Sequence, residues 1–328
     1  MKRVQLIIAF AALGLLAWVI AHAGFTVMVA QLKAMRVALP IVIALSAARL
    51  FLQSTTWSAS LKGENLVVDT ARLAGVRLAS QSMGYLTVFG PALSEPMKIK
   101  LLGTSATPTV TATLLDTGVY WFTSLLVAMS GIVCLPLLAV RGGAYQWIPI
   151  ILTLSLGVFA ITRRSPILDG VMRVLGKRAP SWLARAKTWE ESIRTYRFQQ
   201  PALVGRMFWI GVACQLLIAS EVLVVLWALH LPIHFISVLA IEGVTRALRM
   251  ASGWIPARVG ADEGGAISAF GAVGLSPMLG LGLALTRRVR DLLWALTGIL
   301  WLVWTSRSSN PRGAMKPGLS GLLSERGV

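Results

Sequence analysis

Long apolar stretches, separated by short polar breaks, run along this 328-residue chain. An apolar stretch of about 18–20 residues is long enough to cross the hydrocarbon core of a bilayer as an α-helix. Complete spans are predicted at residues 4–23, 38–60, 107–139, 146–162, 202–229 and 277–306. The pattern therefore predicts an all-α polytopic membrane protein with about six full spans.

The first of these spans has a second interpretation. Basic residues at positions 2–3 precede the apolar run, and the Ala-His-Ala sequence at 21–23 resembles a signal-peptide cleavage site. That site falls at the end of a full-length span, whereas the apolar region of a signal peptide is shorter. We therefore expect an uncleaved first helix.

Two more apolar segments, 72–104 and 233–274, are interrupted by residues that break helices. Proline cannot continue a helix and glycine tolerates strained backbone, so each segment divides into two pieces that are too short to cross a bilayer. Broken backbone at bilayer depth is tolerated only where it is buried in protein or lines a water-filled cavity. We expect each segment to form a re-entrant helical hairpin. The expected turn residues are Pro91, Ser94, Pro256 and Gly260.

The predicted transmembrane domain, residues 1–306, has two halves of similar order. Residues 1–140 and 141–306 each contain two spans, a broken pair and a long helix with a charge near its middle. Between the N-terminus and the first broken segment the chain crosses the membrane an even number of times. Between the N-terminus and the second broken segment it crosses an odd number of times. The two pairs therefore enter from opposite faces, as an inverted repeat, and transporters built in this way hold their substrate near the midplane.

Composition and charge agree with a membrane location. Of all residues, 56% are hydrophobic and 13% are charged, whereas about 25% are charged in soluble domains. The net charge of +18 comes from basic residues that cluster beside the spans. This distribution favours contact with anionic lipid headgroups over nucleic acid, and it places both termini in the cytoplasm.

The most basic part of the chain is the segment 163–200, which should be a cytoplasmic loop. Apolar residues recur within it at helical spacing, which predicts an amphipathic helix on the inner leaflet. A helix packed against the transmembrane bundle is an equally good interpretation. The tail, 307–328, is rich in Gly, Ser and Pro and is predicted to be flexible.

Charged residues inside apolar segments mark the candidate site, because such charges are costly in hydrocarbon. Glu242, Arg246 and Arg249 share one helical face, and the spacing of Arg287 and Arg288 allows both to pair with Asp291. The candidate substrate-binding residues are Arg246, Arg249, Arg258, Glu263, Arg287, Arg288, Arg290, Asp291, Glu95 and Asp116. Their surplus of arginine predicts an anionic ligand, since the guanidinium fork matches phosphate. The alternative is a set of internal ion pairs that holds the bundle together.

The acidic candidates allow two interpretations. Glu95 and Glu263 each follow a proline break, so each could cap a half-helix or contact a proton or a headgroup amine. Asp116 is a lone carboxylate within a long span and is the weaker candidate.

Other chemistry finds little support in the sequence. Cys134 and Cys214 both lie inside apolar spans, and His230 and His234 have no acidic neighbour, so we expect no metal site and no cofactor. A nucleotide-binding loop of the form Gly-x-x-x-x-Gly-Lys-Ser/Thr does not occur. A catalytic dyad cannot be recognised either, and we do not expect an enzyme.

Two short motifs carry a family resemblance. The first is Pro256-x-x-x-Gly260-x-x-Glu263, followed by the helix that bears Arg287, and the second is Gly90-Pro91 with Glu95. With these motifs the chain resembles the flippase-like integral membrane family that is related to the transmembrane part of lysylphosphatidylglycerol synthases. The family pattern usually has glycine where Ser94 stands.

The resemblance implies a multi-pass protein of the bacterial inner membrane that moves anionic or isoprenoid-linked lipid headgroups between leaflets. We do not expect the aminoacyl-transferase domain of the larger members. The alternatives are a non-transporting assembly factor for an envelope-lipid pathway, such as a hopanoid or glycolipid pathway, and an intramembrane lipid-modifying enzyme. The expected partners are membrane lipids, and both a lipid-biosynthesis protein and a second copy of the chain are left open.

Overall fold

The computed structural model of the protein describes residues 33, 35–87, 90–103, 107–137, 199–253, 255–258, 260–307 and 316–317. The predicted spans 4–23 and 146–162, and nearly all of the basic segment 163–200 and of the tail 307–328, lie outside these residues. The amphipathic helix on the inner leaflet and the complete number of spans therefore stay predictions.

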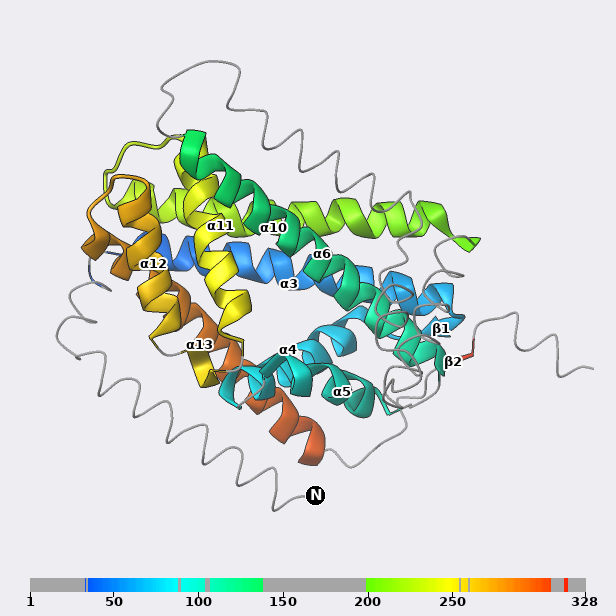
Figure 1. Ribbon diagram of the computed structural model, residues 1–328. Helices are drawn as coiled ribbons and strands as arrows, with labels where there is room; N and C mark the ends of the chain where they lie inside the picture. Colours follow the sequence, from blue (N-terminus) through cyan, green and yellow to red (C-terminus); the bar gives the residue numbers. More distant parts are fainter. Residues whose placement is uncertain are drawn as a thin grey trace, which may run out of the picture.

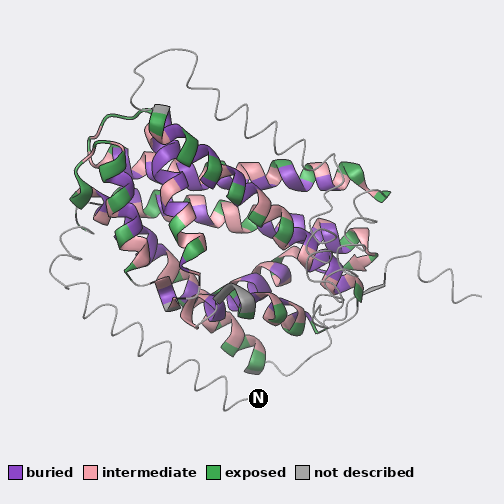
Figure 2. Ribbon diagram, viewed as in Figure 1, coloured by how far each residue is buried: buried purple, intermediate pink, exposed green. Residues whose placement is uncertain are grey.

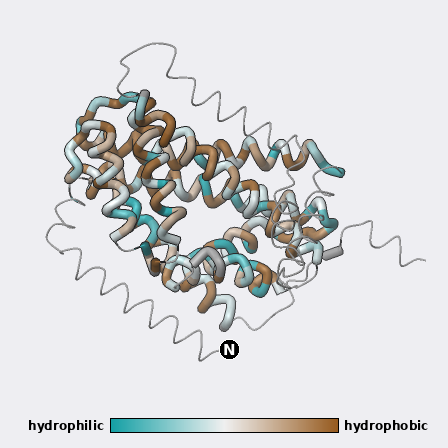
Figure 3. Tube along the Cα trace, in the orientation of Figure 1, coloured by the Kyte–Doolittle hydropathy of each residue, from teal (hydrophilic) through white to brown (hydrophobic). Residues whose placement is uncertain are grey.

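Three helices in the described ranges are long and apolar enough to cross a membrane. These are α3 (Ala38–Gly63), α6 (Thr107–Leu137) and α10 (Pro201–Ala228). They match three of the predicted spans within a few residues, which confirms a helical membrane protein at this level. In Figure 3 these helices are mostly hydrophobic or neutral, whereas hydrophilic positions gather where α4, α11 and α13 approach one another.

The first broken segment is a pair of short helices, α4 (Thr70–Leu86) and α5 (Gly90–Leu102), which pack against each other. The break precedes Gly90, so the expected turn at Pro91 and Ser94 is shifted. Both residues lie inside α5. Pro91 falls in the first turn of this helix, where a backbone N–H has no partner within the helix, so the N–H that proline lacks is not missed. Pro96 also lies within this helix and does not end it.

The second broken segment is formed by α11 (Phe235–Ala251) and α12 (Ala261–Ala272), with the single-turn helix η3 (Pro256–Arg258) between them. Here the break falls where the sequence predicts it. Ala257 and Arg258 both have φ 48°, and Gly260 has φ 79°. The left-handed region suits Gly260, but it strains the two residues that carry a Cβ.

The last long helix, α13 (Pro277–Arg307), occupies the predicted span 277–306. It is not among the helices that are apolar enough to cross a membrane, because charged residues interrupt its middle. It packs against α4 of the first hairpin and α12 of the second, so it joins the two halves (Figure 1). A two-residue strand, β1 (Leu66–Val67), pairs antiparallel with β2 (Lys316–Pro317).

Packing between the halves depends on small residues as well as on apolar ones. Helix α3 packs against α10, and α6 packs against α11. At the second contact, Gly131 of α6 meets Gly243 of α11 so closely that a Cβ on either would overlap the other backbone. Small residues permit this approach between membrane helices.

The outer faces of the bundle are apolar. Trp209 and Leu216 of α10 are 58% and 56% exposed, and Leu300 and Trp304 of α13 are 58% and 67% exposed. Exposed positions recur along the outside of the helices in Figure 2. In water such a surface would be unfavourable, whereas lipid chains are a suitable neighbour for it.

Candidate functional site

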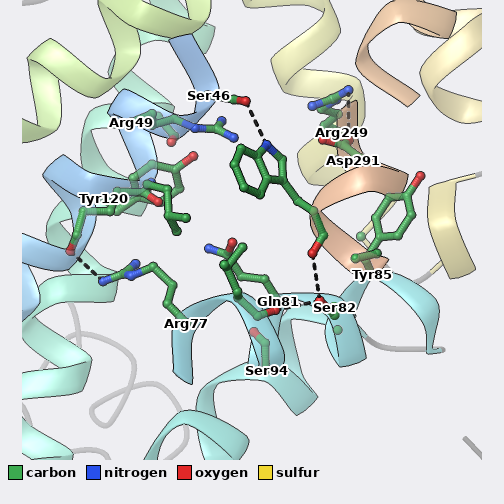
Figure 4. A pocket seen from close by; sticks show the side chains of 18 of the residues that line it. Ser46, Arg49, Arg77, Gln81, Ser82, Tyr85, Ser94, Tyr120, Arg249 and Asp291 are labelled. Carbon is green, nitrogen blue, oxygen red and sulfur yellow. Dashed lines mark hydrogen bonds and ion pairs between the residues drawn. The ribbon is translucent and has the colours of Figure 1, made fainter. Parts of the chain in front are cut away.

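A cavity of about 290 Å³, with many charged side chains in its walls, lies between the two halves of the described structure. Its walls come from α3, α4, α5 and α6 on one side and from α10, α11, the η3 turn and α13 on the other. Seven basic side chains line it: Arg49, Arg77, Lys98, Arg246, Arg249, Arg258 and Arg290. Figure 4 shows Arg49, Arg77 and Tyr120 at one side of this cavity and Arg249 with Asp291 at the other.

Arg77 of α4 and Asp116 of α6 form a buried ion pair in the first wall. Each side chain is 4% exposed. Thr56 donates a hydrogen bond of 2.7 Å to Asp116, and the Arg77 guanidinium also donates to the carbonyl of Gln53 at 2.8 Å. Asp116 is therefore not the lone carboxylate that the sequence predicts, since it neutralises Arg77.

Lys98 of α5 forms the second pair of this wall. Its ammonium lies 2.8 Å from Glu95, and Thr117 donates a hydrogen bond of 2.7 Å to the same carboxylate. Both cations lie near the ring of Trp57, with Arg77 at 5.4 Å and Lys98 at 6.0 Å from its centroid. Their attraction to the aromatic ring offers some compensation for their burial.

Arg49 differs from the other basic residues of the cavity. It lies near the middle of α3, and within the described part of the chain it forms no ion pair. Its Nε is buried and has no hydrogen-bond partner there. The Tyr120 hydroxyl lies within electrostatic reach of both Arg49 and Arg246. Arg49 is therefore a cation whose charge the described carboxylates leave unneutralised.

The second wall is a network around two aspartates. Arg249 approaches Asp262 at 3.0 Å and Asp291 at 4.0 Å, and Arg258 approaches the same two carboxylates at 3.4 Å and 3.6 Å. Arg290 lies 2.7 Å from Asp291. Each aspartate is thus shared by several arginines, which binds α11, the η3 turn, α12 and α13 together.

Behind this wall, two buried glutamates pair with Arg287 and with two arginines that line the cavity. Arg287 approaches Glu221 at 3.3 Å and Glu242 at 2.6 Å. Glu242 also pairs with Arg246 at 2.6 Å, and Glu221 also pairs with Arg290. The spacing of Arg246 four residues after Glu242 therefore does predict a real pair.

The predicted pairing of Arg287 and Arg288 with Asp291 is wrong. Arg287 pairs with carboxylates of α10 and α11, and Arg288 lies 2.6 Å from Glu263 of α12. Asp291 instead faces Arg249, Arg258 and Arg290. These neighbouring residues of α13 therefore have different partners: Arg287 meets α10 and α11, Arg288 meets α12, and Asp291 meets α11 and the η3 turn.

The tips of the two hairpins meet beside the cavity. The Arg258 guanidinium lies 5.3 Å from the centroid of the Tyr85 ring, near the C-terminal end of α4. Such a cation–π contact is worth about 0.5–2 kcal/mol, depending on burial. It connects the strained η3 turn of the second hairpin to the first hairpin.

The cavity brings together only part of the predicted set. The predicted residues that line it are Arg246, Arg249, Arg258, Arg290, Asp291, Glu95 and Ser94. The predicted residues outside its lining are Glu263, Arg287, Arg288, Asp116 and Gly260, and the side chains of Pro91 and Pro256 lie outside the described part of the structure. Sequence reasoning missed Arg49, Arg77 and Lys98 as site residues, although a charge within an apolar segment is itself a signal.

Cations outnumber carboxylates in this region. The cavity and its ion-paired surroundings contain nine described basic residues: Arg49, Arg77, Lys98, Arg246, Arg249, Arg258, Arg287, Arg288 and Arg290. They contain seven described acidic residues: Glu95, Asp116, Glu221, Glu242, Asp262, Glu263 and Asp291. Among the described residues, no group of His, Cys, Asp and Glu is arranged to hold a metal ion. The region is suited to an anion.

Glu263 acts at the start of α12. One carboxylate oxygen accepts a hydrogen bond of 2.9 Å from the Gly260 backbone N–H, and the other lies 2.6 Å from Arg288. Because Arg288 is 4% exposed and has no other carboxylate in the described structure, it depends on this charge. The geometry supports the capping interpretation over contact with the headgroup.

Changing Glu263 to Gln should therefore destabilise the protein by about 1–3 kcal/mol, the cost of leaving a buried polar group poorly satisfied. The amide can still accept from Gly260, but it no longer neutralises Arg288. Thermal unfolding of purified protein measures the loss. Unchanged stability of the variant would contradict the capping role of Glu263.

Comparison with known proteins leaves the family resemblance a prediction. The chain matches no family model, no curated protein and no solved structure.

Proposed function

We propose that this protein moves an anionic lipid headgroup from one leaflet of a bacterial inner membrane to the other, through the cavity between its two halves. The observation that carries the proposal is the cavity lining itself, with seven basic side chains and only Glu95 and Asp291 as acidic ones. Cations at bilayer depth are costly unless they pair or bind an anion, and they commonly mark a substrate pathway.

The size and surroundings of the cavity suit a headgroup rather than a whole lipid. A volume of about 290 Å³ is at the lower end of the ~300–1,000 Å³ range of ligand pockets. The acyl chains would remain outside, against apolar outer faces such as that of α13, where Leu296 and Leu300 are more than half exposed. This arrangement separates the charged part of the lipid from hydrocarbon while the tails stay in it.

The two hairpins supply the elements that would alternate access. In this proposal α4–α5 and α11–α12 are re-entrant, enter from opposite faces and form an inverted repeat with both termini in the cytoplasm. Support comes from the lengths of α4, α5, α11 and α12, which have 17, 13, 17 and 12 residues. These helices are shorter than the ~20 residues that a transmembrane helix needs. The meeting of Tyr85 and Arg258 also supports it, because opposed hairpins would touch at their tips.

The other candidate functions have less support. An assembly factor would rely on the basic segment 163–200 as a docking surface, and that segment lies outside the described residues. An intramembrane enzyme would need a nucleophile or base directed at the headgroup, and the described lining has a cationic rather than a catalytic character.

Reconstitution in liposomes tests the proposal. Headgroup-labelled lipids of several classes would be followed from the inner to the outer leaflet, and at least one anionic class should move faster than in protein-free vesicles. Arg49→Gln should slow that movement by about tenfold, because one charge–phosphate hydrogen bond is lost. Arg49 has no described carboxylate partner, so its removal leaves no buried acid unpaired.

The matched control is Arg206→Gln, the same change at an exposed position on α10. It should leave the rate unchanged, since an exposed cation contributes only screened attraction. Equal effects of the two substitutions would attribute the movement to general surface charge, and no movement of any anionic class would overturn the proposal.

A further inference from the structure

We infer that the headgroup bound in the cavity carries two negative charges, as a phosphate monoester or a diphosphate diester does, rather than the single charge of a phosphodiester. This inference rests on the proposed function, because it names the substrate class of the same site. It follows from the charges in and around the cavity, from two arginines with free hydrogen-bonding capacity, and from the position of these arginines.

The charge balance gives the first step. Nine described cations face seven described carboxylates, so two positive charges remain when every described acid is ionised. Unpaired charges in a buried region are strongly unfavourable. A ligand with two negative charges would complete the balance, whereas a phosphodiester would leave one cation uncompensated.

The unused donors give the second step. Nε of Arg49 and Nε of Arg77 are both buried and have no hydrogen-bond partner among the described residues. Both residues line the cavity. Buried donors are nearly always satisfied in native structures, so two unsatisfied ones in a cavity wall indicate a missing acceptor. A terminal phosphate offers three such oxygens and matches the planar guanidinium group.

The location of these donors gives the third step. In Figure 4, Arg49 and Arg77 lie on the same side of the cavity, together with Tyr120 and away from the network at Asp291. Arg249 and Arg258 on the opposite side already share Asp262 and Asp291. On the α3–α4 side Arg49 alone lacks a described carboxylate, since Arg77 pairs with Asp116 and Lys98 with Glu95, and the second surplus charge belongs to the opposite network of arginines and carboxylates. Because both unsatisfied Nε donors lie on the α3–α4 side, we assign the phosphate to that side.

A pair of lipids that differ only in headgroup charge tests the inference. Dioctanoyl phosphatidate has a phosphate monoester, and dioctanoyl phosphatidylglycerol has a phosphodiester with the same tails. We expect the full-length protein in detergent to bind phosphatidate about tenfold more tightly at about pH 8, where the monoester is doubly charged. At about pH 5, below the second pKa of about 6 that a phosphate monoester has, the preference should largely disappear.

Substitutions show which residues cause the preference for phosphatidate over phosphatidylglycerol. Arg49→Gln should reduce it to about threefold or less, because one positive charge beside the phosphate is lost. Arg49→Lys, which keeps the charge, should retain most of it, and the exposed Arg206→Gln should retain all of it. Loss of the preference in Arg206→Gln as well would contradict the assignment to the α3–α4 side.

Inorganic phosphate distinguishes a lipid from a soluble anion. Binding of inorganic phosphate, which is mostly a dianion at about pH 8, as tightly as phosphatidate would support a dianion site and remove the lipid as its source. Equal affinity for the two lipids at both pH values would overturn the inference. If phosphatidylglycerol still moved in liposomes and Arg49→Gln slowed it, the proposed function would stand without the inference. If the protein bound phosphatidate preferentially but moved no lipid, the binding preference would stand and the proposed transport function would not.

Discussion

Replacing Arg77 with Met should lower the free energy of unfolding by about 3–5 kcal/mol, the cost of breaking a buried ion pair by removing one partner. Arg77 and Asp116 are each 4% exposed at the side chain, and no other described arginine contacts this carboxylate. In the variant, Asp116 would keep the Thr56 hydroxyl as its donor. One neutral hydrogen bond does not replace the lost charge, so the carboxylate stays uncompensated in a buried place.

The double variant with Arg77→Met and Asp116→Asn provides the control. It removes the stranded charge together with its partner, so it should recover most of the stability, as neutral replacements of buried pairs generally do. Thermal or denaturant unfolding of both variants in detergent measures the difference. If Arg77→Met alone were as stable as the wild type, the pair would not be a structural contact. If the double variant were no better than the single one, shape rather than charge would explain the loss.

A second large effect is expected at the contact between α6 and α11. Changing Gly131 to Ala places a Cβ against the backbone of Gly243 and the carbonyl of Leu239. Backbone cannot rotate away as a side chain can, so the helices must separate. Overpacking of this kind costs about 1–3 kcal/mol or more. We expect a lower unfolding temperature and less folded protein after extraction.

Gly118 is the matched control, since it lies in the same helix and has no heavy atom within 4 Å of an added Cβ. Gly118→Ala should be neutral or stabilising, because alanine is favoured over glycine in a helix interior by about 1 kcal/mol. Unfolding temperatures of the two variants, measured side by side, separate helix propensity from packing. A Gly131→Ala variant as stable as Gly118→Ala would show that α6 and α11 do not meet so closely.

Much of the fold can be predicted from the pattern of apolar runs and breakers. The bounds of α3, α6 and α10 differ from the predicted spans by a few residues, since an apolar run long enough to cross a bilayer has few alternatives to a helix. The break near Pro256 is also where it was expected. The first break is less well predicted, because proline in the opening turn of a helix does not interrupt it.

The partners of the charged residues are harder to predict. Spacing along one helix finds the pair of Glu242 and Arg246, because both residues belong to α11. The same rule gives the wrong partner for Arg287, since Glu221 and Glu242 belong to other helices. Asp116 is misinterpreted for this reason too: its partner Arg77 lies on α4. An ion pair between two helices depends on how the helices pack, and this packing cannot be read from a single sequence.

The charges at the centre of α13 also have a consequence for how the protein is made. Each charged side chain at the bilayer centre costs about 2.5–3.5 kcal/mol when a helix enters lipid by itself, and the stretch Arg287–Asp291 holds four of them. Glu221 of α10 and Glu242 of α11, which neutralise this stretch in part, precede it in the chain and are synthesised first. If α13 crosses the membrane, as in the proposed topology, its insertion should require these helices to be in place, and the C-terminal half should then assemble as a group of helices in a fixed order.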